Sequence, residues 1–292
     1  MVTIHPTARL RKSPFYESTV AEGITSASVY NRMIMPTSYG DPLAEYWRLI
    51  RGVSQWDVAV ERQVQLKGPD AGALAQILTP RDLSTCKVGQ GKYAPLCNHG
   101  GVLINDPILL KLADDLYWFS IADSDIWLWA RAIAAERRLD VEITEPDVSP
   151  MAIQGPKAEA VVTSVCGDWV RELKYFWFRE TEIEGIPVAV QRSSWSKQGG
   201  FEIYLRDGSR GMRLWDIFRG RGVRSTSDPV RLRRPNGPRV DCSRSAATPT
   251  VLPTHSRSGL ASMLISTSET TSSASRRFVR LQREEPRGNN SA

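Results

Sequence analysis

The chain has 292 residues, of which 41% are hydrophobic, so it can hold one large domain or two ordinary ones with a real core. Its four cysteines contain no C-x-x-C pair, which argues against a zinc site or a disulfide framework and favours a reduced, cytoplasmic compartment. No apolar run approaches the roughly 18 residues that cross a bilayer, and residues 1–11 lack the hydrophobic stretch of a secretion signal, so membrane insertion and export are disfavoured.

The formal net charge of +6 is concentrated at one end of the chain. Residues 225–292 hold 11 arginines, no lysine and five acidic residues, whereas residues 1–224 hold 27 basic and 27 acidic residues. The terminal segment has no tryptophan or tyrosine, and 20 of its 68 residues are Ser or Thr, so it cannot bury enough apolar surface to offset its ordering entropy. An Arg/Ser-rich arm could hold nucleic acid through phosphates, but the lack of interleaved aromatic residues disfavours that partner.

Hydrophobic periodicity predicts helices that alternate with antiparallel strands, which is an α+β pattern without internal repeats. In chain order we expect a helix at 43–51, a strand pair within 53–66, a helix at 70–78, strands at 92–96, 102–110 and 116–121, a helix at 124–138, strands at 141–143 and 151–153, a helix at 158–165, strands at 188–191 and 201–205, and a helix at 212–218. Pro80 is expected to end the helix that precedes it.

The segment at 196–205 is the strongest local signal of a ligand site. Gly199 and Gly200 allow a backbone bend that other residues resist, and an alternating strand follows at once. In that strand Glu202 and Tyr204 share one face, opposite the apolar residues. The alternative is a surface hairpin with its polar side in water.

The segment at 98–110 has the same organisation. A Gly100-Gly101 turn leads into a strand, and Asp106 lies inside an apolar run. Read from the residues alone, Asp106 is a strand carboxylate that ends the ladder next to Pro107, or a functional group. His5, His99 and His255 show neither metal-ligand spacing nor a partner for a catalytic triad, so no metal is expected.

Five strings in the same order along the chain resemble the folate-dependent T-protein family, which includes the aminomethyltransferase of the glycine cleavage system. They are G-P-D-A at 68–71, L-T-P-R-D at 78–82, the segment at 98–110, Q-G-P-K at 154–157 and the segment at 196–205. The segments at 118–125 and 145–150 are typical of the tetrahydrofolate-dependent dimethylsulfoniopropionate demethylase branch. The likeness runs from about residue 13 to about residue 220.

This resemblance implies two intertwined α+β subdomains around a central folate cleft, formed by residues 1–224, with tetrahydrofolate as methyl acceptor. Family members continue with a further C-terminal domain, and residues 225–292 resemble no part of it. We expect this tail to be a low-complexity, disordered segment or the product of a shifted reading frame.

The resemblance also implies roles for individual residues around the folate. Asp106 matches the catalytic aspartate, which stabilises positive charge developing on the folate N5. Glu202 and Tyr204 would contact the pterin, since a carboxylate suits its paired N–H donors. Tyr93 would line the same pocket.

A sulfonium donor would lie against aromatic faces, because the ring quadrupole attracts a cation that cannot donate hydrogen bonds. The candidates are Tyr30, Trp177 and Trp195, although the run at 174–178 also fits a half-buried core strand. Lys197 or Arg32 would hold the substrate carboxylate, and either could equally be a solvated surface charge. Ser120 is a further hydrogen-bond donor.

The expected function is therefore methyl transfer from dimethylsulfoniopropionate or a similar small donor to tetrahydrofolate. Aminomethyl transfer of the glycine cleavage type is the nearest alternative. A folate-binding relative without transferase activity is a third, although the Lys-Gly-Cys motif of the iron–sulfur maintenance branch does not occur. A truncated, inactive product is the last alternative.

Overall fold

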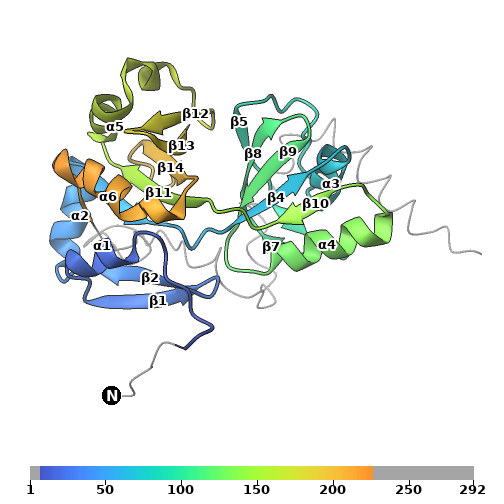
Figure 1. Cartoon of the computed structure of the whole chain (residues 1–292), viewed down its shortest axis with the longest axis horizontal. Helices are drawn as coiled ribbons and strands as arrows, with labels where there is room; N and C mark the ends of the chain where they lie inside the picture. The colour runs from blue at the N-terminus through green and yellow to red at the C-terminus, as the bar shows by residue number, and fades with distance from the viewer. Residues whose placement is uncertain (1–6, 226–292) are drawn as a thin grey trace, which may run out of the picture. The chain divides into compact units, whose positions relative to one another are not determined.

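Two sheets, antiparallel except for one parallel pair at an edge of the larger sheet, frame the part of the chain that a computed structural model describes, residues 7–225 (Figure 1). The six-stranded sheet has the order β12 (Phe178–Ile183), β13 (Ile186–Arg192), β14 (Gly200–Leu205), β11 (Ser149–Gln154), β3 (Ser54–Asp57) and β15 (Arg224–Ser225). The five-stranded sheet has the order β10 (Glu142–Thr144), β4 (Gln63–Lys67), β9 (Leu116–Ser120), β8 (Ile108–Ala113) and β5 (Gln90–Tyr93). The predicted tail, apart from its first residue, lies outside these described residues.

Two short hairpins, six α-helices and two 3-10 helices, η1 (Asp168–Glu172) and η2 (Gly208–Arg210), complete the described elements. The hairpins are β1 (Ser26–Tyr30) with β2 (Met33–Ser38) and β6 (Leu96–Cys97) with β7 (Leu103–Asn105). The helices are α1 (Tyr16–Ala21), α2 (Pro42–Arg51), α3 (Ala71–Leu78), α4 (Ile126–Arg137), α5 (Ala158–Cys166) and α6 (Gly211–Gly220). No helix within residues 7–225 combines the length and apolarity that a membrane crossing needs.

Local sequence explains where these helices begin and end. At α2 the Asp41 carboxylate accepts hydrogen bonds from the backbone amides of Leu43 and Ala44 at 3.1 and 3.0 Å, and Pro42 occupies the first helical position. α3 ends at Leu78 because Thr79 is extended before Pro80.

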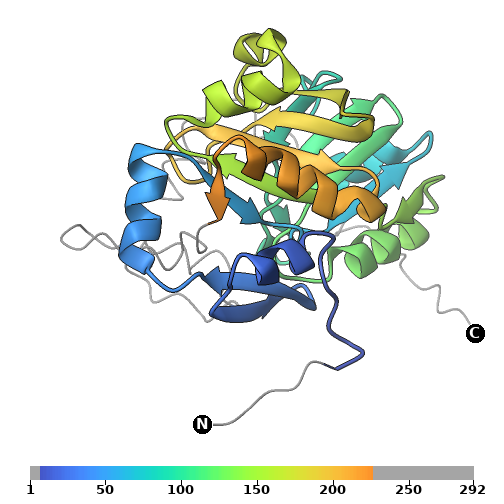
Figure 2. The same cartoon turned by 60° about the vertical axis from the view of Figure 1, so that its left-hand side comes forward.

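Each sheet packs a hydrophobic core of its own on the face that is turned away from the other sheet. The odd-numbered residues of β14 pack against Leu214, Trp215 and Phe218 of α6, which crosses the sheet in Figure 2. On the other sheet, apolar residues of β4 and β9 pack against α3 and α4. This one-sided alternation is what a strand period of two produces.

The inner faces of the two sheets pack on each other. Leu110, Leu112 and Trp118 of the five-stranded sheet share one cluster with Ala189 and Tyr204 of the six-stranded sheet. Tyr204 is fully buried there. The polar face of β14 is therefore turned toward the other sheet, which contradicts the alternative of a hairpin with its polar side in water.

All five predicted helices are present, and the α+β class is confirmed. The predicted strand pair at 53–66 is wrong: β3 and β4 lie in different sheets, because residues 58–62 carry the chain from one sheet to the other. The predicted strand at 102–110 is two strands, since β7 ends before Asp106 and β8 begins after Pro107. The β1–β2 hairpin and β12 have weak alternation and were missed.

Candidate active site

The Gly199-Gly200 bend that opens β14 is confirmed, with positive φ values of 78° and 154°. A side chain at position 200 would place its Cβ 2.4 Å from the carbonyl oxygen of Ile153. Glycine is therefore required for β14 to lie this close to β11. The register that follows sets Glu202 opposite Gln191 of β13.

Glu202 is a buried carboxylate, only 8% exposed. The Tyr204 hydroxyl donates a hydrogen bond to its Oε2 at 2.7 Å, and Ser193 contacts it as well. No Lys, Arg or His within residues 7–225 forms an ion pair with it. Burial is the main cause that raises the pKa of Glu202, and Tyr204 and Ser193 lower that pKa in part. A ligand that brings N–H donors would therefore offset the free-energy cost of burying this carboxylate.

Asp106 occupies the break between β7 and β8 and is half-buried. Burial raises its pKa to about 6, while its own backbone amide and a hydrogen bond with Tyr93 lower that pKa in part. Tyr93 comes from β5, which pairs with β8, so the sheet register holds the two side chains together. Asp106 also forms no ion pair with a described cation.

Tyr30 is near enough to Asp106, and Tyr204 near enough to Glu202, for the charges of these carboxylates to act on them. Burial first, and then the charges of Glu61 and Asp106 among others, raise the pKa of the Tyr30 phenol. Burial, and then the charges of Glu202 and Glu61, raise the pKa of Tyr204 in the same way. The charges of Asp106 and Glu61 thus both act on Tyr30, and those of Glu61 and Glu202 both act on Tyr204.

Ser120 lies at the end of β9 and contacts residues of the same group. Its hydroxyl accepts a hydrogen bond from the Gln63 amide at 2.9 Å and donates one to Glu61 Oε2 at 3.4 Å. It also contacts Tyr204. Side chains from both sheets thus meet in one polar site.

Other predicted site residues are not joined to this group by any hydrogen bond, ion pair or ring contact among residues 7–225. Trp195 is half exposed and meets Trp56 edge to face, with ring centroids 6.3 Å apart. Lys197 is exposed at a positive φ of 61°. Trp177 is half-buried just before β12, and of the run at 174–178, alternatively read as a half-buried core strand, only Phe178 belongs to that strand. Arg32 pairs with Asp125 at 3.3 Å.

The site also contains residues that sequence reasoning missed. Glu61 lies in the stretch for which the sequence predicts a strand pair. Gln191 places its Oε1 3.2 Å from the Tyr204 hydroxyl, and its position opposite Glu202 follows only from the strand register. Tyr175 is near enough for the Glu202 charge to contribute to its raised pKa, after burial as the larger cause. None of these residues has a local motif that could have identified it.

Comparison with known proteins gives consistent matches. The sequence matches the GCVT N-terminal domain over residues 15–233, more than half of the chain. It is 42% identical over 223 residues to dimethylsulfoniopropionate demethylase DmdA of Ruegeria pomeroyi, covering 76% of this chain and 61% of that protein. It is 30% identical over 188 residues to an aminomethyltransferase of Bacillus mycoides, covering 62% of this chain and 50% of that protein.

A solved structure has the same fold. The glycine cleavage system aminomethyltransferase T from Bartonella henselae superposes with a TM-score of 0.64 at 22% identity, covering 74% of this chain and 59% of that one. The chain therefore spans between half and about three fifths of the length of these relatives. The match over most of the described residues places the chain in the GCVT N-terminal domain family.

Proposed function

We propose that this protein transfers a methyl group from dimethylsulfoniopropionate, or a similar small cationic donor, to tetrahydrofolate. The observation that carries the proposal is the buried Glu202–Tyr204 pair, which meets Ser120 of the other sheet, together with Asp106 held beside Tyr93. The 42% identity to a dimethylsulfoniopropionate demethylase supports this donor class.

The Glu202 end of the site would hold the pterin of tetrahydrofolate. A buried carboxylate without a cationic partner suits the paired N–H donors of the 2-amino-4-oxo ring, and the Tyr204 hydrogen bond fixes its orientation. Tyr93 would line the pocket beside Asp106. When bound, tetrahydrofolate supplies the nucleophilic N5 that accepts the methyl group.

The Asp106 end would stabilise the charge that the transfer creates. The carbon–sulfur bond breaks as the new carbon–nitrogen bond forms, so a neutral thioether leaves and the positive charge moves to the acceptor nitrogen. An ionised Asp106 stabilises that charge and can accept the proton released from N5, which suits a carboxylate with a pKa of about 6. Holding the two reactants in line supplies much of the remaining acceleration.

Aminomethyl transfer is the second candidate, because several relatives are named aminomethyltransferases at 25–30% identity. Purified full-length chain is incubated with tetrahydrofolate and one donor at a time: methyl-labelled dimethylsulfoniopropionate, or an aminomethyl group carried on a lipoylated protein. We expect label on folate with the sulfonium alone. Label from the aminomethyl donor alone would favour the second candidate, and no transfer from either donor would contradict both. A cytoplasmic location remains part of the proposal, in keeping with the free Cys86, Cys97 and Cys166.

A further inference from the structure

A pocket of about 470 Å³ lies between the end of α2, one face of α5 and the end of α6. Its volume falls within the range of about 300–1,000 Å³ that is usual for small-molecule sites. No acidic residue of the described part of the chain lines it. Its cations are Arg48, Lys157 and Arg221, and its apolar side chains are Val53, Ala160 and Val161.

Backbone contacts hold the walls of this pocket together. The amide of Lys157 donates to the carbonyl oxygen of Gly52 at 3.0 Å, and the amide of Gly52 donates to the carbonyl oxygen of Arg48 at 2.8 Å. A Cβ at Gly155, where φ is 124°, would lie 2.5 Å from the Gly52 oxygen, so glycine is required for this close approach. β15 pairs in parallel with β3, which brings the end of α6, and with it Arg221, beside the start of β3.

Lys157 and Arg221 have no carboxylate partner among residues 7–225. Neither side chain makes an ion pair, a hydrogen bond or a ring contact within that range, and both residues are exposed. The acidic residue of α5, Glu159, is engaged by Arg192 at 2.6 Å. The pocket therefore presents two positive charges that no described residue balances.

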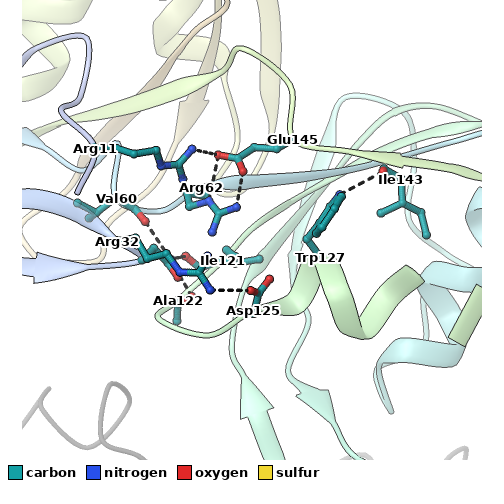
Figure 3. A network of polar contacts seen from close by, with 11 residues as sticks. Arg11, Arg32, Val60, Arg62, Ile121, Ala122, Asp125, Trp127, Ile143 and Glu145 are labelled. Carbon is teal, nitrogen blue, oxygen red and sulfur yellow. Dashed lines mark hydrogen bonds and ion pairs between the residues drawn. The ribbon is translucent and has the colours of Figure 1, made fainter. Parts of the chain in front are cut away.

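A second group of arginines in the described part of the chain is balanced by carboxylates. Figure 3 shows Arg11 and Arg62 directed to Glu145, and Arg32 directed to Asp125. The Arg11–Glu145 and Arg32–Asp125 distances are 2.7 and 3.3 Å, and Arg62 Nε donates to Glu145 Oε1 at 3.0 Å. This fold thus supplies counter-charges where arginines serve to join segments, and the pocket lined by Lys157 and Arg221 has none.

We propose that this pocket binds a small phosphate monoester. A phosphate monoester carries a charge of about −1.5 to −2 at pH 7 and offers three acceptor oxygens, which suits two cations without a carboxylate. Lys157 supplies a compact ammonium, and the planar guanidinium of Arg221 can donate two parallel hydrogen bonds. The organic part of the ester lies on the apolar wall formed by Val53, Ala160 and Val161. This inference does not depend on the proposed methyl transfer.

The test measures phosphate binding to the full-length chain by calorimetry. The probes are inorganic phosphate, phenyl phosphate and phenol, which separate the contribution of the anion from that of the apolar wall. The site variant is Lys157→Gln combined with Arg221→Gln. The matched control is Lys67→Gln combined with Arg81→Gln, which removes two exposed cations that do not line the pocket and changes the net charge equally.

We expect phenyl phosphate to bind the unchanged chain in a 1:1 ratio, at least about threefold more tightly than inorganic phosphate, with no binding of phenol. The site variant should weaken phenyl phosphate binding at least about tenfold, and the control should keep the affinity within about twofold. Lys157→Arg, which keeps the charge, should stay within about threefold. Circular dichroism verifies that each variant is folded.

Ala160→Glu tests the same pocket with both cations left in place. Ala160 is an exposed residue of α5, and glutamate is a good helix former, so the helix should persist. A carboxylate at this position supplies the missing counter-charge and should weaken phenyl phosphate binding at least about tenfold. No binding to the unchanged chain, an equal loss in the site and control variants, or full affinity in Ala160→Glu would overturn the inference.

Discussion

The phenol of Tyr204 donates a 2.7 Å hydrogen bond to the carboxylate of Glu202, two residues earlier on the same face of β14. Both side chains are turned toward the second sheet, and no described cation balances the carboxylate. Burial without a cation costs folding free energy, which a binding partner with N–H donors can offset. Glu202 is therefore expected to lower the stability of the ligand-free fold and to raise the affinity for a ligand with N–H donors.

Glu202→Gln should weaken tetrahydrofolate binding while leaving the fold as stable as before, or more so. The substitution removes a charge-assisted hydrogen-bond acceptor, worth about 1.5–3 kcal/mol, and it also removes the cost of burying a charge. Calorimetric titration and thermal unfolding measure the two effects. Glu182→Gln, an exposed carboxylate on β12 of the same sheet, is the control and should change neither. A variant that is destabilised without any loss of affinity would contradict this role.

Methyl transfer should depend on the ionisation of Asp106. With a pKa of about 6, the carboxylate is charged above that pH, so the rate should fall as the pH drops below about 6. Asp106→Asn should slow transfer by about 10²-fold or more and abolish this inflection. Rates measured between pH 5 and pH 8 in single-turnover experiments would detect both changes.

Tyr93→Phe provides a second, independent check on Asp106. The Tyr93 hydrogen bond lowers the pKa of Asp106, so its loss should move the inflection above pH 6. The substitution keeps the ring that packs in the pocket. An inflection that stays in place or moves to lower pH would show that another group controls the rate.

Asp57 should make the protein less stable as the pH rises. It is 5% exposed, the Ser13 hydroxyl and the backbone amide of Ala59 donate to it, and burial raises its pKa from 3.8 to about 6. Because the folded-state pKa is the higher one, its favourable contribution is complete below pH 3.8 and is lost as the pH rises through about 6.

Asp57→Asn keeps the acceptor for Ala59 and removes the buried charge. Its free energy of unfolding relative to the unchanged chain should therefore be higher at pH 7–8, by up to about 3 kcal/mol, and the difference should shrink toward pH 4. Urea unfolding at several pH values measures it. A difference that does not vary with pH would mean that Asp57 is neutral, or charged and compensated, throughout.

The Arg62–Glu145 pair joins the two connections between the sheets, β3 to β4 and β10 to β11, and should stabilise the fold there. Its side chains are 14% and 30% exposed, against 57% for both members of the surface pair Lys12–Glu17. A double-mutant cycle with Arg62→Gln and Glu145→Gln should give a coupling of about 1 kcal/mol or more in the free energy of unfolding. The equivalent cycle at Lys12 and Glu17 should give a value near zero. Equal coupling in the two cycles would contradict this distinction.

The sequence predicts the parts of this site that depend on local periodicity. Glu202 and Tyr204 share a face because successive strand residues alternate, and the Gly-Gly bend before them follows from the conformations that glycine allows. The helices were found because their apolar stripes and end signals are local as well. The family resemblance, rather than any spacing, singled out Asp106 and Tyr93.

Contacts between distant segments could not be predicted in this way. Residues 53–66 show the near-alternation of a strand pair, yet residues 58–62 cross between the sheets with Glu61 among them. Trp195 and Lys197 are close to Glu202 in sequence, but the turn at 193–199 leaves both exposed. Proximity to Glu202 along the chain therefore does not predict that a loop residue lies in the site.

The most direct test of the account is a crystal structure of the full-length chain with bound 5-methyltetrahydrofolate. We expect the pterin to lie between the sheets, with the Glu202 carboxylate at hydrogen-bonding distance from its N–H groups and Asp106 close to N5. A folate bound to any other surface, or in contact with only one of these two carboxylates, would contradict the single site on which the proposed transfer depends.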